Sequence, residues 1–421
     1  MRRKNTDIKI EIFIDSLAPG GDGTGTYGDK MCFVAGGVPG DTVNVKVIKQ
    51  DKRNIWAAID SFIQKSQLRR EPLCTVAESC GGCIWQHISY EEQAEQKRQT
   101  IARIFGVNTV LFTASREEYG YRRLARLHFE KKGKGAARVG FFAEKAHKIV
   151  DIDNCPVFEP ALSGTILPIK EGPLAAVDGR GELLLSSGPG GVWLYLKSDR
   201  WLPSVFYEEA RKLVPEVLKG VVCEVEGIRS VVAGTSDIQI STDTGMLINM
   251  PAGSFGQANS YINNQMIVLL KKWITDLPSI ERCVELFAGA GNFSLAIAPL
   301  VKQLETVEMD SRACRTAVLN FKEHNIFNVH VRSGNAETLI DVCSKKAELV
   351  ILDPPRTGNA LIAKKLAAGS AHTIIYISCN PKTLKRDMKI LNDGGFNLTD
   401  IEGFDMFPQT PHIEVMAMMS R

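Results

Sequence analysis

The stretch "RCVELFAGAGNFSLAIA" at residues 282–298 reads as a buried strand, a glycine-rich turn and the start of a helix. Gly289 and Gly291 allow a tight turn and let a ligand approach the backbone closely. Further on, "LETVEMD" (304–310) ends a second strand on Glu308, where a carboxylate is placed to bind ribose hydroxyls. Short apolar strands alternate with helices from about residue 256 onward, which predicts an α/β domain with a mostly parallel sheet.

A third strand end narrows the class of ligand. In "AELVILDPPRTG" (347–358) the strand ends on Asp353, and the two following prolines hold this residue at the carboxyl edge of the sheet. Ser294 stands where a dinucleotide fingerprint has its third glycine, which disfavours a nicotinamide cofactor. The pattern therefore favours a methyltransferase over a nicotinamide oxidoreductase, with an ordinary loop-capping aspartate as the structural alternative.

A fourth apolar run, "IIYISCNPKTLKRD" (374–387), ends on Cys379. Asn380 suits a helix N-cap and Pro381 suits the first helical position. The positive end of that helix favours a thiolate at Cys379, which makes this residue a candidate nucleophile. A cysteine that only fills the core is the equally weighted alternative.

Length and composition indicate a soluble protein of two or three domains. The chain has 421 residues, of which 44% are hydrophobic and 24% charged, with a formal net charge of +3. No segment is long and apolar enough for a membrane span or a signal peptide, so we expect a cytoplasmic protein without a membrane partner. We predict domains at residues 5–65, 66–250 and 251–421, and a monomer. As an alternative to its place in the second domain, a helix near residues 90–117 packs on the third.

The basic charge lies toward the N-terminus. Residues 1–155 hold 25 Lys and Arg against 19 Asp and Glu, and residues 115–148 hold 10 against 4. Arginines and lysines alternate there with tyrosines and phenylalanines, which is typical of contact with looped RNA; a solvated hairpin is the alternative. Alternating strands and glycine-rich turns over residues 8–63 predict a five-stranded, oligonucleotide-binding (OB)-like β-barrel.

Four of the ten cysteines have the spacing of a metal site. Three of them surround Gly-Gly, and the fourth lies 72 positions further on: Cys74, Cys80, Cys83 and Cys155. Both tetrahedral zinc and a four-iron cluster take four thiolates, so the spacing leaves the two open.

Several motifs together resemble the RNA uridine-5-methyltransferases. They are "QAN" (257–259), "ELFAGAGNFSL", "VEMD", "DPPRTG", "SCNPKTLKRD" and "PHIEVM" (411–416), in the family's order. The resemblance covers nearly the whole chain. It implies a Rossmann-like class I methyltransferase domain, an N-terminal TRAM domain, and a mixed α+β central domain carrying a [4Fe-4S] cluster on the four cysteines.

The resemblance also implies the roles of individual residues. Cys379 would be the nucleophile and Glu414 the general base. S-adenosyl-L-methionine contacts would come from Gln257, Phe287, Asn292, Glu308, Asn335 and Asp353, although Gln257 and Asp353 could face the uracil instead. Ala288 and Ala290 stand where other members carry bulkier or cysteine residues.

The expected activity is methylation of carbon 5 of one uridine in structured RNA. Ribosomal 23S RNA is preferred over the tRNA T-loop, because a barrel together with a cluster resembles the ribosomal members. The rival from another class is an iron–sulfur RNA-binding protein that has lost catalysis; the joint presence of Cys379, Glu414 and Asp353 argues against it.

Overall fold

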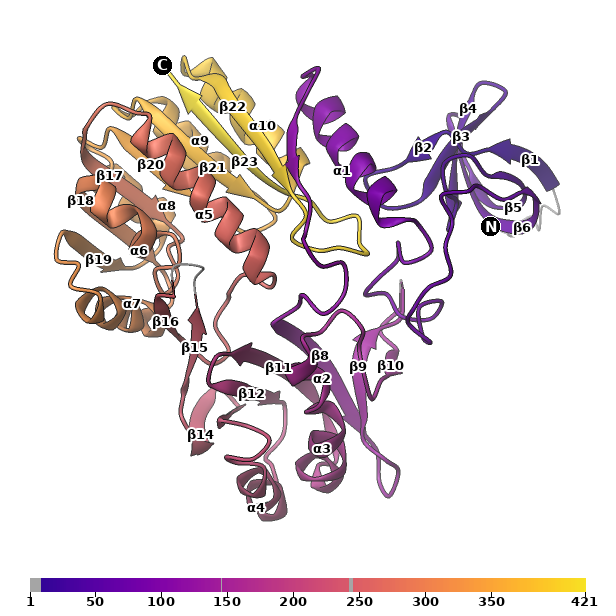
Figure 1. The fold of residues 1–421 in the computed structure, drawn as a ribbon, viewed down its shortest axis with the longest axis horizontal. Helices are drawn as coiled ribbons and strands as arrows, with labels where there is room; N and C mark the ends of the chain where they lie inside the picture. Colours follow the sequence, from indigo (N-terminus) through magenta and orange to yellow (C-terminus); the bar gives the residue numbers. More distant parts are fainter. Residues whose placement is uncertain (1–8, 145, 242–244) are drawn as a thin grey trace.

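The computed structural model describes residues 9–144, 146–241 and 245–421, arranged in three bodies (Figure 1). The predicted barrel start at residues 5–8 lies outside the described part. The first body is a six-stranded sheet in the order β1-β5-β6-β4-β3-β2. Its strands are β1 (Lys9–Phe13), β2 (Ser16–Leu17), β3 (Gly23–Tyr27), β4 (Lys30–Ala35), β5 (Thr42–Gln50) and β6 (Asn54–Gln64).

The N-terminal sheet curls around its own apolar core. In β5, Val43, Val45 and Val47 point inward and are buried, while Lys46 between them is exposed. This curled sheet fits the predicted barrel-like domain, but it has six strands where the sequence predicted five. The extra strand, β2, has only two residues, too few to produce an alternating pattern.

The central body is a seven-stranded sheet in the order β10-β9-β8-β11-β12-β13-β14. Its strands are β8 (Leu124–Lys131), β9 (Arg138–Phe142), β10 (Ile149–Asp151), β11 (Gly179–Gly188), β12 (Gly191–Ser198), β13 (Gly220–Val225) and β14 (Ile228–Gly234). Apolar residues of four short helices form one core with the sheet. These helices are α2 (Pro160–Ser163), α3 (Ile166–Glu171), η1 (Pro173–Ala176) and α4 (Ser204–Lys212). A two-stranded ribbon, β15 (Asp237–Ser241) and β16 (Leu247–Pro251), leads to the third body.

The third body is an eight-stranded sheet in the order β19-β18-β17-β20-β21-β23-β22-β7. Its strands are β7 (Leu111–Thr113), β17 (Ile280–Leu286), β18 (Val301–Glu308), β19 (Val329–Ser333), β20 (Leu349–Leu352), β21 (Thr373–Ser378), β22 (Asn397–Phe404) and β23 (Glu414–Ser420). Strands β17 to β21 run parallel, as predicted, and every residue of β20 and β21 is buried. This is a doubly wound α/β fold in which β23 runs antiparallel to both of its neighbours.

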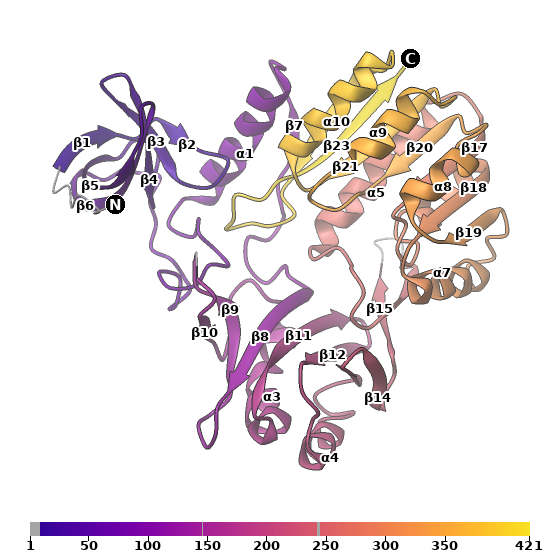
Figure 2. The same cartoon turned by 180° about the vertical axis from the view of Figure 1, so that it is seen from behind.

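Helices cover both faces of this sheet (Figures 1 and 2). Helices α5 (Ser260–Thr275) and α6 (Ser294–Ile297) share one apolar core with the sheet. The other core contains α8 (Ala336–Cys343), α9 (Ala360–Ala367) and α10 (Pro381–Asp393). The remaining elements are α7 (Ser311–Glu323), which packs on β16, and η2 (Ala298–Leu300).

The segment that follows the N-terminal sheet enters the third body. Helix α1 (Tyr90–Phe105) contributes Ile101 and Phe105 to the same core as α10, and strand β7 pairs in parallel with β22. Phe105 is followed by Gly106 at φ 71°, the left-handed conformation that ends many helices. The eight-stranded sheet is therefore completed by residues far away in the sequence. No helix in the described ranges has the length and apolar character needed to cross a membrane.

Candidate active site

The parallel strands deliver the predicted site residues to one edge of the sheet. Leu286 pairs with both Val307 and Leu352, and Leu352 pairs with Tyr376, so these strand ends are level. Strand β18, which follows β17 in the chain, lies on one side of β17 in the sheet, whereas β20 lies on its other side. Ligands bind in α/β sheets at such a switch point. The residues that come shortly after these strand ends are Phe287, Glu308, Asp353 and Cys379.

The glycine-rich turn is tied to Glu308. Phe287, Gly289 and Gly291 all have positive φ values, of 63°, 57° and 97°. The Gly289 N–H donates to one carboxylate oxygen of Glu308 at 3.0 Å, and the Asp310 N–H donates to the other at 2.7 Å. Backbone donors thus orient the Glu308 carboxylate at the turn. Phe287, which is not a glycine, is held there in a strained conformation.

Two predicted cofactor contacts are also anchored in the fold. The Asn292 amide exchanges hydrogen bonds with Asn263 of α5, at 2.8 and 3.0 Å. Asn335 caps α8, where its side-chain oxygen accepts the Glu337 N–H at 2.7 Å. Asn335 follows β19, one strand beyond Glu308.

Cys379 and Glu414 lie across adjacent strands. Ser378 of β21 pairs with Val415 of the antiparallel β23, which places their neighbours Cys379 and Glu414 together at the sheet edge. Asn380 caps α10 as predicted, accepting the Lys382 N–H at 3.1 Å. The fold therefore brings the predicted nucleophile and the predicted base to one place.

The acidic groups at this edge of the sheet are buried, and their pKa values are raised. Burial raises the pKa of Asp353 from 3.8 to about 7. Burial, and then the charge of Asp353, raises the pKa of Glu414 well above 4.5, and Arg356 opposes this shift. Burial, Glu414 and Asp353 raise the pKa of Cys379 to about 12, again against Arg356. Protons are therefore held at this edge at neutral pH, which is the property expected of acid–base groups.

Gln257 lies beside Asp353, with its amide nitrogen 3.5 Å from a carboxylate oxygen. The Gln257 segment is held from the central body by Arg123, which donates its Nε to the Gln257 carbonyl at 3.0 Å and its N–H to that of Ala258 at 2.9 Å. Arg123 belongs to the basic stretch 115–148, which the sequence predicted to contact RNA or to form a solvated hairpin. That expectation is wrong, because Arg123 is only 4% exposed.

Two residues of the site were not singled out from the sequence. Arg356 is the cation beside Cys379 and Glu414, and its Nη2 lies 3.2 Å from Nδ1 of His412. Both lie inside motifs quoted for the resemblance, "DPPRTG" and "PHIEVM". An arginine that follows a buried acidic strand end was the available signal.

The four predicted cluster cysteines interact electrostatically with one another. Burial, and then the neighbouring Cys80 and Cys74, raises the pKa of Cys83 to about 11. Burial, followed by Cys83 and Cys74, raises the pKa of Cys155 to about 12. Within the described ranges, however, no three Cys, His, Asp or Glu residues are gathered closely enough to hold a metal ion.

Comparison with known proteins identifies the class of enzyme. The family model "tRNA (Uracil-5-)-methyltransferase" matches residues 235–421. The 23S rRNA (uracil(1939)-C(5))-methyltransferase RlmD of Vibrio parahaemolyticus is 30% identical over 439 residues, covering 100% of this chain and 98% of the relative. This chain belongs to the RNA uracil-5-methyltransferase family. It is an S-adenosylmethionine-dependent methyltransferase.

One further relative and one solved structure are similar to nearly the whole chain. RlmD of Alteromonas naphthalenivorans is 29% identical, over 97% of this chain and 89% of the relative. A solved structure, the Pyrococcus abyssi tRNA (uracil-54, C5)-methyltransferase with S-adenosyl-L-homocysteine, is 24% identical. It superposes with a TM-score of 0.76 over 97% of this chain and 100% of that one, so the whole fold is shared.

Proposed function

We propose that the enzyme methylates carbon 5 of a uridine in 23S rRNA through a covalent bond between Cys379 and carbon 6 of the uracil. The observation that carries this proposal is the pairing of β21 with β23, which sets Cys379 beside Glu414 and both beside Asp353. Because the site is at a sheet edge, the target base leaves its stack to reach it.

Cys379 makes carbon 5 nucleophilic. When its sulfur bonds to carbon 6, the ring becomes an enolate with electron density on carbon 5. Arg356 and the N-terminus of α10 favour the thiolate against burial, and Asp353 is the neighbouring acceptor for the thiol proton. Gln257, beside Asp353, orients the uracil.

The part of the cofactor in the reaction is to donate one group. S-adenosylmethionine supplies the methyl group that carbon 5 accepts. The turn at Gly289 and Gly291, which approaches a ligand without side chains, fits this cofactor, as does the oriented carboxylate of Glu308. Phe287, Asn292 and Asn335 complete the proposed contacts.

Glu414 completes the reaction. Once carbon 5 carries both the methyl group and a proton, the Glu414 carboxylate removes that proton. The electron pair left behind forms the C5–C6 double bond and expels the Cys379 thiolate. Burial beside Asp353 gives Glu414 a raised pKa, which suits a group that must take a proton from carbon.

The central body supports RNA binding. A hollow on its sheet is lined by the stacked rings of His128 and Phe142, whose centroids are 3.9 Å apart, and by charged residues of both signs: Arg180, Lys197, Glu130, Glu182 and Asp199. Stacking faces beside cations suit unpaired nucleotides. The relatives named for 23S rRNA favour that substrate. The second candidate is the tRNA T-loop, since the solved structure is named for a tRNA.

The four cysteines are assigned to a [4Fe-4S] cluster. The thiols come from two segments, carry no disulfide and raise one another's pKa values, which suits a multi-thiolate site. Zinc also takes four thiolates, and the resemblance to the RNA uridine-5-methyltransferases favours the four-iron cluster. The cluster's role is to join residues 74–83 to Cys155, away from the chemistry. Visible absorption with about four irons per chain supports this assignment; stoichiometric zinc refutes it.

The experiment compares Cys379→Ala with Cys343→Ala, a buried cysteine in α8. Both variants and the wild type receive 23S rRNA fragments or tRNA transcripts with labelled methyl donor. We expect 5-methyluridine in 23S rRNA from the wild type and Cys343→Ala, and none from Cys379→Ala. Full transfer by Cys379→Ala refutes the covalent mechanism, and transfer to tRNA alone refutes the ribosomal substrate. Mapping 5-methyluridine in RNA from cells lacking the protein identifies the position.

A further inference from the structure

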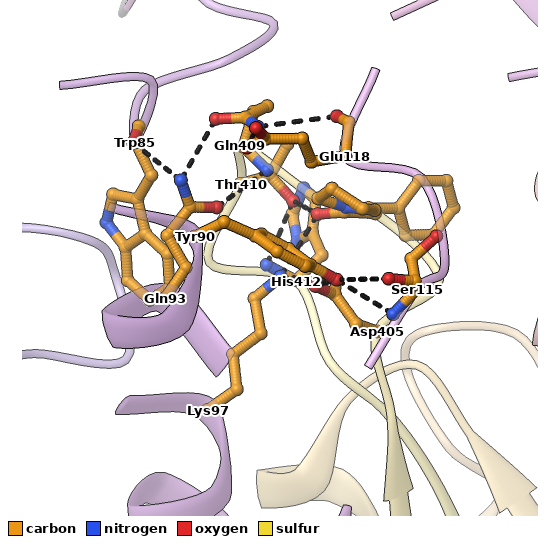
Figure 3. A network of polar contacts seen from close by, with 12 residues as sticks. Trp85, Tyr90, Gln93, Lys97, Ser115, Glu118, Asp405, Gln409, Thr410 and His412 are labelled. Atoms are coloured by element: carbon orange, nitrogen blue, oxygen red, sulfur yellow. Dashed lines mark hydrogen bonds and ion pairs between the residues drawn. The ribbon is translucent and has the colours of Figure 1, made fainter. Parts of the chain in front are cut away.

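The loop 405–413 joins β22 to β23 and carries a buried network of side chains (Figure 3). Phe404, the last residue of β22, pairs with Glu414, the first residue of β23. The loop therefore begins next to the Glu414 strand end with Asp405 and returns to it after His412. The conformation of the loop therefore affects where the Glu414 side chain lies.

Helix α1 anchors the beginning of this loop with a buried ion pair. Lys97 Nζ donates to Asp405 Oδ1 at 2.6 Å and to the Phe407 carbonyl at 3.1 Å. The side chains of Lys97 and Asp405 are both 0% exposed. The Tyr90 hydroxyl lies 3.0 Å from the other oxygen of Asp405.

The middle of the loop is anchored at Gln409. Gln93 of α1 accepts the Gln409 N–H at 2.8 Å and donates to its side-chain oxygen at 2.9 Å. The Trp85 N–H donates to the Gln409 carbonyl at 3.0 Å. Gln409 is fully buried at φ 69°, a left-handed conformation that a non-glycine residue keeps only when its surroundings impose it.

The end of the loop reaches the reactive groups. His412 donates its N–H to Thr410 Oγ1 at 3.2 Å, and its Nδ1 faces Arg356 Nη2 at 3.2 Å. His412 itself is exposed, and because a guanidinium group can only donate, its Nδ1 accepts the arginine N–H. Arg356 is the cation that acts on Cys379 and Glu414.

Stability alone does not account for this arrangement. A buried ion pair costs so much desolvation that apolar residues of similar volume are often as stabilising. What the ion pair adds is one defined geometry for a loop that ends at Glu414. We propose that Lys97, Gln93 and Tyr90 of α1 are positioning residues for removal of the carbon 5 proton, acting through loop 405–413 on Glu414 and Arg356. This inference rests on the role proposed above for Glu414.

The test replaces the ion pair with an apolar pair, in the full chain. We expect Lys97→Met/Asp405→Leu to keep the wild-type melting temperature within a few degrees and to bind S-adenosylmethionine normally. We expect its turnover to fall about 10- to 100-fold, as for a misplaced catalytic group. Proton removal then limits the rate. RNA deuterated at carbon 5 should therefore show a larger isotope effect, and a methylated RNA–protein adduct should accumulate on denaturing gels.

A milder variant and a control accompany the double variant. Tyr90→Phe removes a single hydroxyl group from the network and should raise the isotope effect by a smaller amount. Asp41→Asn alters another fully buried carboxylate, paired with Arg69 in the N-terminal sheet and outside loop 405–413. It should leave the isotope effect and the adduct fraction at wild-type values.

The outcomes separate this inference from the proposed function. If wild-type enzyme forms no Cys379-dependent adduct, the proposed function fails and the inference fails with it. If the wild type forms the adduct but neither network variant changes the isotope effect or the adduct fraction, the inference alone is overturned. It is also overturned if cofactor binding and melting temperature fall in step with turnover while the isotope effect is unchanged.

Discussion

Two carboxyl groups stand at the two ends of loop 405–413, and both are buried. Asp405 is 0% exposed and Glu414 is 4% exposed. Asp405 receives a lysine and a tyrosine hydroxyl group at hydrogen-bond distance. Glu414 instead lies beside the carboxyl group of Asp353 and the guanidinium of Arg356, and burial and then Asp353 raise its pKa well above 4.5. The two carboxyl groups are thus equally buried but have different electrostatic surroundings.

The difference supports a structural role for Asp405 and the catalytic role proposed for Glu414. A buried carboxylate with a full set of partners has no vacancy for a substrate and fixes the surrounding chain. A buried carboxyl group beside another carboxyl group destabilises the folded state when ionised, and folding retains it only at a cost. Such costs are typical of active sites, where activity and stability oppose each other.

Glu414→Gln should have the largest effect, because it removes the base without changing its size. We expect turnover to fall about 10²- to 10⁴-fold, the usual contribution of a general base. Methyl transfer to RNA should still occur once, leaving a methylated adduct on Cys379. The control is Glu402→Gln on the neighbouring β22, whose carboxylate accepts from Thr113. Normal product release by Glu414→Gln contradicts the assignment.

Neutralising the two kinds of aspartate should change stability in opposite directions. Asp405→Asn leaves Lys97 buried without a charged partner and should cost about 3–5 kcal/mol of unfolding free energy. Asp353→Asn should gain about 2–4 kcal/mol at pH 8, because the folded state no longer has to ionise a buried carboxyl group. Denaturant unfolding measures both.

The gain from Asp353→Asn depends on pH with a definite sign. Below about pH 4 Asp353 is protonated in the folded and unfolded chains, so the wild type carries no penalty. As pH rises from there through about 7, the unfolded chain ionises first and the wild type loses stability. The variant should thus match the wild type at low pH and exceed it at pH 8. A gain at every pH contradicts the burial argument.

The strand ends that carry the predicted site residues could be located from the sequence, because the patterns that mark them are local. Strand ends at Glu308, Asp353 and Cys379 are marked by apolar runs followed by turn residues, and the α10 cap is marked by Asn380 and Pro381. Parallel pairing then brings these ends together whatever the details of the loops. The position of these strand ends was therefore predictable, and the parallel strands bring them to one edge of the sheet.

The residues that surround this edge were not predictable in the same way. Arg123 lies in a basic stretch, and only the tertiary fold shows that it is buried against the Gln257 segment. Lys97 occupies a polar-looking helix, and its partner Asp405 is more than three hundred positions away in the chain. No local period encodes such pairs, since they depend on how β7 and α1 join a sheet made elsewhere.

Arg123→Met should have the smallest effect and extends the comparison to the central body. Its guanidinium orients the Gln257 carbonyl, while one of its nitrogens, Nη2, is buried without a partner. We expect about a tenfold loss of kcat with little change in the RNA KM. The matched variant is Arg126→Met, an exposed arginine paired with Glu182, which should act on RNA KM and its salt dependence instead. The reverse pattern contradicts the positioning role.

The most direct measurement uses RNA in which the target uridine carries fluorine at carbon 5. Fluorine cannot leave as a proton does, so elimination stops after Cys379 has bonded to the ring. After incubation with S-adenosylmethionine and digestion, mass spectrometry should find a methylated fluorouridine on the peptide containing Cys379. A nucleotide attached to any other residue, or no attached nucleotide from an enzyme that methylates unmodified RNA, contradicts the account.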